Sequence, residues 1–285
     1  MATFTNQATL SYRDTVVNSN VVTGEILEAL AITKNPLTST YGYNDEVTYV
    51  INVTNSGATA LNGLNFTDDL GAYDFGTGTL VPLTYVDGTL NYYLNGVLQP
   101  TPTVLAGPPL TVTGISVGAG GNALIIYQAK VNEYAPLAAG STVTNTATVA
   151  QADPTRSASD SATISVVTEP ELSITKGISP AVINENGQLT YTFTVRNYGN
   201  TAVIATDNAV ITDTFEPILT ITSVTYNGTP WTEGVNYTYN ETTGEFATVA
   251  GQLTVGAATY TQDAVTGAWS VIPAEAVITV TGTVA

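Results

Sequence analysis

The segment Thr142-Val-Thr-Asn-Thr-Ala-Thr-Val149 recurs near the start of the chain as Thr3-Phe-Thr-Asn-Gln-Ala-Thr-Leu10. Three threonines, one asparagine and one alanine are identical in register. In both copies small, apolar and amide side chains alternate with threonines or other polar residues, which is typical of a half-buried β-strand. The chain therefore carries the same strand-forming segment at two places, far apart in the sequence.

The surroundings of the two copies differ. The middle copy follows an apolar run, Ala123-Leu-Ile-Ile-Tyr-Gln-Ala-Lys-Val131, which is itself strand-like. The corresponding run near the end, Ala276-Val-Ile-Thr-Val-Thr-Gly-Thr-Val284, is followed by a single residue. We therefore expect the second half of this sequence to lack the closing strands of the first half, and the N-terminus to carry a spare set.

The composition is that of an all-β protein. Of the 285 residues, 44% are aliphatic or aromatic and only 10% are charged, with 16 Tyr and abundant Thr and Val. The chain has no Cys and no His, which removes disulfides, thiolate nucleophiles, His-based triads and the usual Zn²⁺ sites. We expect no cofactor, no metal and no enzyme activity, apart from a self-modification considered below.

The charge argues against two classes of partner. A net charge of −17 rests on six Lys and Arg residues, so clustered cations for binding nucleic acid or an anionic membrane are missing. No stretch has the length and apolarity of a transmembrane segment, so we expect no membrane insertion. The start, Met-Ala-Thr-Phe-Thr, shows no secretion signal. Either a signal is missing from this sequence or the protein leaves its cell by another route, such as lysis of a mother cell.

Internal duplication gives the domain organisation. Three segment pairs match in order: 30–34 with 172–176, 44–57 with 186–199, and 66–70 with 211–215. Short alternating runs separated by Gly turns predict two tandem immunoglobulin-like β-sandwich domains. We place an N-terminal extension at 1–29, a complete first domain at 30–168, and an incomplete second domain at 169–285. Two further hairpins are expected at Asp87-Gly88 and Asn227-Gly228.

These motifs resemble a known family. The order L-x-I-T-K, then V-x-N-x-G, then T-D, and finally V-x-N-x-A-x-V is similar to the bacterial surface repeat called domain of unknown function 11. The similarity spans nearly the whole chain, once in full and once truncated. It implies immunoglobulin-like modules of exported or envelope-associated fibrous proteins, and it names no ligand.

The N-terminal copy is suited to act as a donor strand. An incomplete sandwich leaves unpaired backbone groups and an open core, which a strand from another chain repairs. Phe4, Asn6, Ala8 and Leu10 alternate in the way that such an inserted plug requires. Head-to-tail exchange would then build a homopolymer.

Two alternatives keep residues 1–29 within their own chain. They could fold back onto their own second domain, or add an edge strand to the first. Within the extension we expect a turn at 14–20 and a second strand at 21–27, whose destination the sequence leaves open.

Polar residues fall on the apolar faces of three predicted strands. Lys34 shares a face with Leu30 and Ile32, and Asp68 shares one with Phe66 and Leu70. In the second domain the equivalents are Lys176 and Asp213. Asn145 and Asn6 also face inward on their strands. A Lys, an acid and an Asn are therefore expected together inside each domain, where burial favours the neutral amine.

Such a trio can form a Lys–Asn isopeptide bond, and it resembles the self-crosslinked domains of Gram-positive surface pilins, without their exact motif. In the first domain the bond would join Lys34 to Asn145, assisted by Asp68. In the second, Lys176 and Asp213 would receive Asn6 of the next subunit. The alternatives are a buried Lys–Asp salt bridge capped by the amide, or a bulge that turns Lys34 to solvent.

The function predicted from these features is that of a structural subunit in an extracellular bacterial fibre, at the cell or spore surface. The rival prediction is a monomeric adhesin or carbohydrate-binding module, with Tyr41, Tyr43, Tyr92 and Tyr93 as a binding face. A hydrolase would need paired acids in a cleft, for which the sequence offers no constellation.

Overall fold

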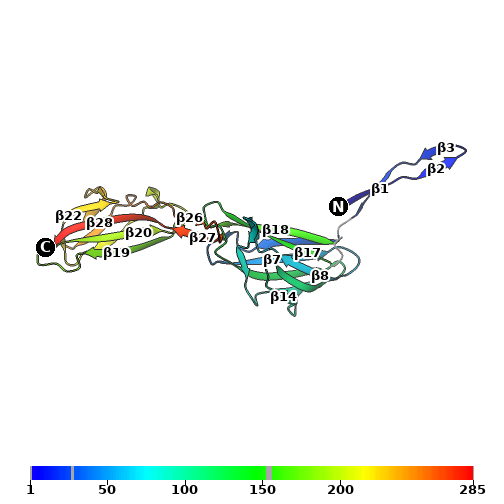
Figure 1. The fold of residues 1–285 in the computed structure, drawn as a ribbon, viewed down its shortest axis with the longest axis horizontal. Coiled ribbons are helices and arrows are strands. Elements are labelled where there is room, and N and C mark those ends of the chain that lie inside the picture. Colours follow the sequence, from blue (N-terminus) through cyan, green and yellow to red (C-terminus); the bar gives the residue numbers. More distant parts are fainter. Residues whose placement is uncertain (1, 27–28, 152–155, 285) are drawn as a thin grey trace. The chain divides into compact units, whose positions relative to one another are not determined.

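A computed structural model describes residues 2–26, 29–151 and 156–284. It is almost entirely β-structure, and the chain divides into two compact units, Met1–Asn132 with Val143–Ile164, and Glu133–Thr142 with Ser165–Ala285 (Figure 1). The predicted all-β class with two tandem immunoglobulin-like β-sandwiches is confirmed. The two are called the first and second sandwich below. No helix among the described residues has the length and apolarity needed to cross a membrane.

The first sandwich consists of two six-stranded antiparallel sheets. One has the order β13-β12-β16-β7-β5, with β11 also paired to β16; the other has the order β14-β15-β8-β17-β18-β6. The first sheet comprises β5 (Leu30–Pro36), β7 (Glu46–Asn55), β11 (Leu83–Tyr85), β12 (Asn91–Leu94), β13 (Val97–Gln99) and β16 (Asn122–Val131). The second comprises β6 (Thr40–Tyr41), β8 (Leu61–Asp68), β14 (Thr103–Leu105), β15 (Leu110–Val117), β17 (Thr142–Ala150) and β18 (Ser157–Val166). A small ribbon, β9 (Tyr73–Phe75) with β10 (Gly78–Leu80), completes the unit.

The alternation read from the sequence sets the core of this sandwich. Along β7 every second residue is buried, from Val47 to Asn55, and along β17 the buried residues are Val143, Asn145, Ala147 and Val149. Because successive side chains of a strand point to opposite faces, each sheet turns one apolar face inward. The four inward positions of β17 are the ones that Phe4, Asn6, Ala8 and Leu10 copy.

The second sandwich has one large sheet and smaller ones opposite. The large sheet has the order β19-β20-β28-β22-β23, and a three-stranded sheet has the order β21-β25-β24. Its elements are β19 (Leu172–Ser179), β20 (Gln188–Asn197), the 3₁₀ turn η1 (Ala205–Asp207), β21 (Thr212–Thr214), β22 (Leu219–Tyr226), β23 (Thr229–Pro230), β24 (Tyr237–Tyr239), β25 (Glu245–Thr248), β26 (Thr259–Gln262), β27 (Trp269–Ile272) and β28 (Ala274–Val284). Strands β26 and β27 pair with each other.

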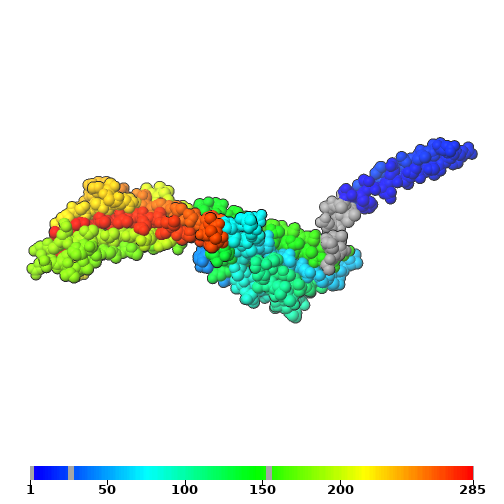
Figure 2. All heavy atoms as spheres, viewed as in Figure 1, coloured from blue at the N-terminus to red at the C-terminus, as the bar shows by residue number. Residues whose placement is uncertain are grey.

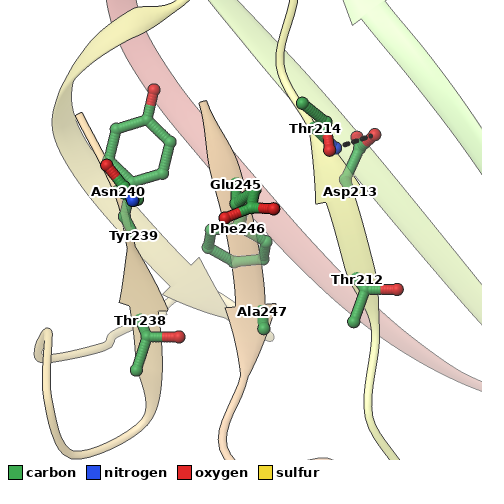
Figure 3. A pocket seen from close by; sticks show the side chains of 9 residues that line it. All are labelled: Thr212, Asp213, Thr214, Thr238, Tyr239, Asn240, Glu245, Phe246 and Ala247. Atoms are coloured by element: carbon green, nitrogen blue, oxygen red, sulfur yellow. Dashed lines mark hydrogen bonds between the residues drawn. The ribbon is translucent and has the colours of Figure 1, made fainter. Parts of the chain in front are cut away.

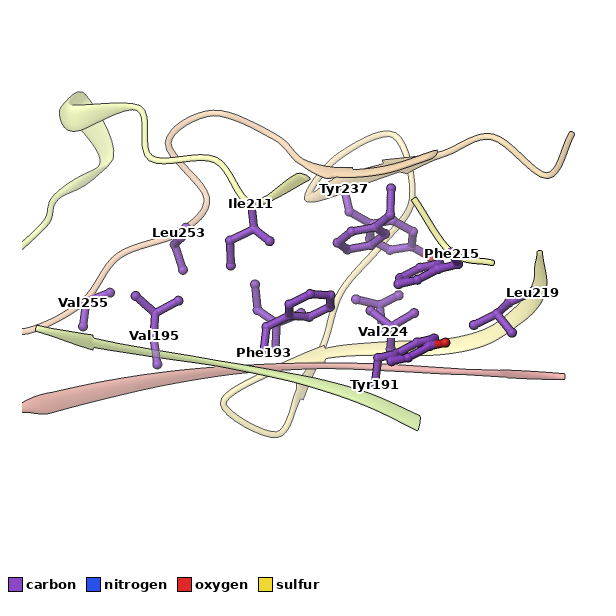
Figure 4. Close-up of a cluster of buried hydrophobic side chains, with 14 of the residues drawn as sticks. Tyr191, Phe193, Val195, Ile211, Phe215, Leu219, Val224, Tyr237, Leu253 and Val255 are labelled. Carbon is purple, nitrogen blue, oxygen red and sulfur yellow. The ribbon is translucent and has the colours of Figure 1, made fainter. Parts of the chain in front are cut away.

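Aromatic side chains dominate the core of the second sandwich. Tyr191 stacks on Phe215 at 5.0 Å between ring centroids, and Phe193 stacks on Phe246 at 6.3 Å. Figure 4 shows the side chains of Tyr191, Phe193 and Val195 rising from β20 toward residues of the opposite layer. This sandwich therefore has its own core, which the described residues form without any contribution from the N-terminal segment.

The repeated V-x-N-x-G motif makes the same buried clamp in both sandwiches. Asn55 Nδ2 donates to the carbonyl oxygens of Thr59, Val117 and Gly118, and its Oδ1 accepts from Gly57 N at 3.0 Å. The second sandwich repeats the arrangement, with Asn197 Nδ2 donating to the carbonyl oxygens of Thr201 and Gly256 and its Oδ1 accepting from Gly199 N. The side chain replaces backbone partners at the strand end, which explains why a buried Asn recurs there.

The N-terminal segment forms a β-hairpin, called the arm below (residues 2–26). Strand β1 (Ala2–Asn6) pairs with β4 (Val22–Ile26), and β2 (Thr9–Tyr12) pairs with β3 (Thr15–Asn18). The turn lies at Arg13-Asp14, which both have positive φ (44° and 63°), as a two-residue type I′ turn requires. The prediction of a turn at 14–20 is therefore wrong, because Thr15-Val-Val-Asn18 continues the hairpin as a strand.

Of the two other expected hairpins, one is confirmed. Asn227-Gly228, with φ of 48° and 78°, connects β22 to β23. The hairpin at Asp87-Gly88 is wrong, because β11 and β12 both pair with β16 and not with each other. The hairpin in that region turns at Asn95-Gly96 and joins β12 to β13.

Candidate functional site

The three predicted residues of the first sandwich meet inside it. Lys34 comes from β5, Asp68 from the end of β8 and Asn145 from β17, so the two sheets contribute jointly. All three side chains are buried, with relative exposures of 3%, 0% and 0%. The alternative in which a bulge turns Lys34 to solvent is therefore wrong, because the strand keeps its alternation and the backbone N–H of Lys34 is held by Asp160 Oδ2 at 2.8 Å.

A tyrosine that the sequence analysis missed joins these side chains. Lys34 Nζ forms an ion pair with Asp68 Oδ2, and Tyr127 Oη donates to the same oxygen at 2.6 Å. Lys34 Nζ and Asn145 Nδ2 each lie 3.4 Å from Tyr127 Oη. Tyr127 lies at an inward position of the apolar strand β16, so the alternation alone marked it as core without marking its hydroxyl as part of a network.

Burial and charge act in opposite directions on the lysine. Burial lowers the pKa of Lys34 below its ordinary value of 10.5, and attraction by the Asp68 carboxylate offsets part of that decrease. Burial also raises the pKa of Tyr127, to which the nearby negative charge of Asp68 adds. The Lys34 ammonium lies 4.7 Å from the centroid of the Tyr49 ring, a cation–π contact that favours the charged form.

The amide of Asn145 is only half satisfied. Its Nδ2 donates to Tyr127, whereas its Oδ1 is buried and makes no hydrogen bond. A buried acceptor without a donor is costly and therefore rare. A protonated carboxyl beside it would remove this cost and would polarise the amide carbonyl, as the predicted crosslinking chemistry requires.

The equivalent pair in the second sandwich is more exposed. Lys176 Nζ forms an ion pair with Asp213 Oδ2, with side-chain exposures of 39% and 19%. The expectation that this lysine is buried is wrong for the single chain. Lys176 lies over the ring of Tyr191 at 4.3 Å, and Val280 takes the place of Tyr127 opposite that ring. The second site thus has the lysine and the acid, but neither the asparagine nor the tyrosine hydroxyl.

The strand that carries this lysine is exposed along its whole length. In the first sandwich β5 buries Leu30 and Ile32, at 6% and 7% exposure. In the second, the matching residues Leu172 and Ile174 on β19 are 46% and 54% exposed. The two segments have almost the same sequence, so the difference arises from what covers them. In the first sandwich β18 approaches β5, as the bond from Lys34 N to Asp160 shows.

The second sandwich also has an unpaired strand edge. In the first sandwich β8 lies between β15 and β17. Among the described residues, its counterpart β21 pairs with β25 alone. This pairing corresponds to that of β8 with β15, because Asp213 lies opposite Phe246 and the matching Asp68 lies opposite Leu110. The edge that β17 occupies in the first sandwich is therefore unpaired in the second, as far as the described residues show.

A hollow of about 590 Å³ lies over the three-stranded sheet of the second sandwich. Its lining is mostly polar and comes from all three strands (Figure 3): Thr212, Asp213, Thr214, Thr238, Tyr239, Asn240, Glu245, Phe246 and Ala247. Asp213 Oδ1 accepts from the backbone of Thr214 at 2.9 Å. No group of three or more potential metal-ligating side chains occurs among the described residues.

The four plug residues lie on the arm and are exposed. Phe4 is 52% and Leu10 is 67% exposed, and Asn6 and Ala8 belong to the same exposed stretch. Figure 2 shows the arm as a narrow ribbon, coloured blue. Its strands pair only with each other in the described part of the chain, so neither alternative that adds them to a sheet of their own chain is observed.

Comparisons with known proteins leave the family open. No family model matches the chain, and no curated protein matches it, so membership of the domain of unknown function 11 family is not confirmed. The chain is similar to the major pilin subunit BcpA of Bacillus cereus (12% identity, 95% of this chain and 73% of that one, TM-score 0.35). It is also similar to a C-terminal fragment of the major pilin GBS80 of Streptococcus agalactiae (12% identity, 86% and 91%, TM-score 0.33).

A third similar structure is the collagen-binding subdomain of the Enterococcus faecalis surface protein ACE (9% identity, 50% of this chain and 99% of that one, TM-score 0.30). At these identities and TM-scores the similarities establish neither a family nor a function for this chain. The assignment of two β-sandwiches rests on the strand order and the cores described above.

Proposed function

We propose that this protein is the structural subunit of an extracellular bacterial fibre and that it polymerises head to tail by strand donation. The arm of one subunit fills the open edge of the second sandwich of the next. The observation that carries the proposal is the contrast between matched strands: the inward face of β5 is buried, whereas that of β19 is exposed. The arm copies the segment that completes the first sandwich.

The joint has the physical properties of a donor-strand interface. Backbone hydrogen bonds to the free edge of β21 would supply affinity, and alternate side chains of the arm would fill the core. Exposed apolar side chains on both partners, Leu172 and Ile174 on one and Phe4 and Leu10 on the other, would leave water on joining. Donor and acceptor lie at different places on the chain, so the contact is heterologous and produces a filament unless it closes into a ring.

Isopeptide bonds would lock the assembly. The neutral Lys34 amine attacks Cγ of Asn145, the new Nζ–Cγ amide forms, and the former amide nitrogen leaves as ammonia with protons relayed by Asp68. Burial of both side chains around the Tyr127 hydroxyl would supply a high effective concentration. The same step between Lys176 and Asn6 of the next subunit, with Asp213 as the relay, would make the fibre covalent.

The rival function is a monomeric adhesin or carbohydrate-binding module, although its expected tyrosine face is wrong in part, because Tyr41 and Tyr92 are buried. The polar hollow of about 590 Å³ in the second sandwich is the observation that favours it, because Thr, Asn, Glu and Tyr side chains suit a sugar ligand. Part of its lining, Thr212 to Thr214, belongs to the strand whose free edge would accept the arm.

Electron microscopy of the purified protein tests the proposal. We expect filaments from the full chain and single particles after deletion of residues 1–12. A matched pair isolates the plug: Phe4→Asp should abolish filaments, whereas Thr5→Asp, on the opposite face of the same strand, should keep them. Filaments that persist without residues 1–12 would contradict strand donation, and dispersed particles of the full chain would favour the rival function.

A further inference from the structure

The arm is a preformed two-stranded element. Cross-strand contacts join its halves beyond the ladder itself: Ser19 N donates to the Ala8 carbonyl at 2.8 Å, and Ala8 N donates to Ser19 Oγ at 2.9 Å. The type I′ turn at Arg13-Asp14 matches the twist of the strands that it connects. A donor that is already ordered loses less conformational freedom on binding than a flexible single strand does.

The element that completes the first sandwich is also a hairpin, formed by β17 and β18. Thr144 Oγ1 lies 2.8 Å from Thr163 Oγ1, and Thr146 Oγ1 lies 3.0 Å from Ser161 Oγ, which fixes the antiparallel register of these strands. In the arm, Thr5 stands directly opposite Thr23. Both hairpins therefore carry an outward Thr–Thr pair, one position after the inward residue Val143 or Phe4.

The inward pair next to each Thr–Thr pair keeps the same total number of side-chain carbon atoms. In the first sandwich Val143 and Ile164 take these positions, and both are buried. In the arm the pair is Phe4 and Gly24, and the Phe4 ring covers the glycine so closely that a Cβ on Gly24 would lie 2.4 Å from Phe4 Cζ. In the arm, the Phe4 ring lies over a glycine, whereas the first sandwich has two branched side chains at these positions. A packed core tolerates apolar exchanges of this kind.

The second sandwich is open at the positions of both strands. The free edge of β21 corresponds to the place of β17, and the exposed face of β19 corresponds to the surface beside β18. In the first sandwich β18 also pairs with β6 (Thr40–Tyr41); the matching residues are Val182, which is 88% exposed, and Ile183, and they form no strand. A single donated strand would leave this second opening uncovered.

We infer that the donated unit is the whole arm, inserted as an intact hairpin. This rests on the proposed function and specifies its joint. The free edge of β1 and β2 meets β21 of the next subunit, while β3 and β4 stay paired and cover β19. The register of β17 on β8, with Thr148 opposite Thr67 and Ala147 opposite Asp68, places Thr9 opposite Thr212 and Ala8 opposite Asp213.

Engineered disulfides test this, since the chain has no cysteine of its own. Thr5→Cys with Thr23→Cys places two thiols on the outward face, where a closed disulfide prevents the arm from opening. We expect the oxidised, thiol-free protein to polymerise at a rate within about twofold of the reduced protein, a margin that corresponds to less than about 0.5 kcal/mol. Polymerisation that occurs only after reduction would overturn the hairpin inference and leave strand donation intact.

A second pair of cysteines tests the register. Thr9→Cys with Thr212→Cys should link neighbouring subunits into covalent oligomers on oxidation, whereas Thr9→Cys with Thr214→Cys, two residues out of register, should not. Crosslinking by the second pair instead of the first would overturn the register. If neither pair crosslinks and no variant forms filaments in either redox state, the proposed function itself fails.

The Phe4–Gly24 pair gives an independent readout. Gly24→Ile alone should slow polymerisation at least tenfold, because the new side chain collides with the ring. The double change Phe4→Val with Gly24→Ile copies the pair of the first sandwich and should restore the rate. Failure of the double change to restore it, with circular dichroism showing an intact fold, would mean that β4 does not enter the acceptor core.

Discussion

At the scale of single residues, the main feature is a lysine side chain that is buried away from water. Lys34 is buried against the Asp68 carboxylate and the Tyr127 hydroxyl, and that hydroxyl in turn accepts a hydrogen bond from the Asn145 amide. Breaking such a pair by removing one partner leaves an uncompensated buried charge, whereas the proposed amide, with ammonia released and the displaced proton held by Asp68, would leave neither side chain charged. The proposed crosslink would therefore relieve the cost of keeping this charged pair inside the core.

The intramolecular bond predicts a mass deficit. The arm-deleted protein, which stays monomeric, should be lighter than its sequence mass by one ammonia, and Asn145→Ala or Lys34→Met should restore the full mass expected for each variant. Asp68→Ala should leave the lysine and asparagine unlinked, because the proton relay is gone. Intact-protein mass spectrometry after denaturation measures this, and a full sequence mass for the unsubstituted protein would exclude the bond.

The lowered pKa of Lys34 predicts a pH dependence of stability where no bond can form. In the folded Asn145→Ala variant the pKa of Lys34 is lower than in the unfolded chain, where it has its ordinary value of 10.5. At a pH between these two pKa values, unfolding takes up a proton. The free energy of unfolding should therefore rise with pH in that window. Urea titrations between about pH 7 and pH 9.5 measure it, below the region above about pH 10 where the raised pKa values of Tyr49 and Tyr127 reverse the trend.

The control for this experiment removes both charges. Lys34→Met with Asp68→Asn in the same background keeps the volume of the network and leaves no ionisable lysine. Its stability should be flat over the same pH interval. An equal slope in this control would assign the effect to other groups.

At the scale of elements, two strands of nearly identical sequence have opposite surroundings. Leu30-Ala-Ile-Thr-Lys34 is half buried, and Leu172-Ser-Ile-Thr-Lys176 is exposed. An exposed apolar strand at the edge of a sheet favours pairing with another chain. The second sandwich thus has its own aromatic core and one exposed strand, which the proposal assigns to a partner.

This contrast predicts unequal effects of one substitution at matched positions. In the arm-deleted monomer Ile32→Ser should lower the free energy of unfolding by about 2–4 kcal/mol, because it removes buried methyl groups and buries a hydroxyl. Ile174→Ser should cost less than about 1 kcal/mol there, because the side chain is already half in water. Denaturant unfolding separates the two.

In the full chain the same pair should behave differently. Ile174→Ser should weaken filament formation although the monomer is nearly unaffected, which a sedimentation assay of polymer against monomer would detect. A loss of stability as large as that of Ile32→Ser, or unchanged assembly, would contradict a role of β19 as an acceptor surface.

At the scale of the whole molecule, the proposed donor, the arm, and the proposed acceptor, the second sandwich, belong to different parts of the same chain. With a net charge of −17, copies of this chain repel one another at low salt, so the proposed assembly would depend on a specific joint and not on general attraction. A polymer of this kind would grow only while one end presents a free arm or the other end presents an open second sandwich.

Arm-deleted subunits should therefore act as chain terminators. They keep the acceptor and lack the donor, so each one that receives an arm ends growth at that end. Added in equimolar amount to the full chain before assembly, they should shorten filaments in electron micrographs, and the same protein carrying Ile174→Ser should shorten them less. Filament lengths unaffected by the arm-deleted protein would contradict growth through the acceptor of the second sandwich.

The sequence by itself determined what is local. Period-2 alternation assigned the inward faces of β5, β8 and β17, and so placed Lys34, Asp68 and Asn145 inside the first sandwich, because consecutive side chains of a strand must point to opposite faces. The duplication identified the arm as a copy of β17, since identical alternation implies the same kind of strand.

The tertiary structure decided what depends on which strands meet. It brought the Tyr127 hydroxyl into the lysine network. It also left β19 exposed, and β21 with one partner among the described strands, although both strands have sequences like those of their counterparts. It also placed a tight turn at Arg13-Asp14 that makes the arm a hairpin. Strand pairing is long-range, and burial is set by the neighbour that covers a face, so neither follows from the alternation within a single strand.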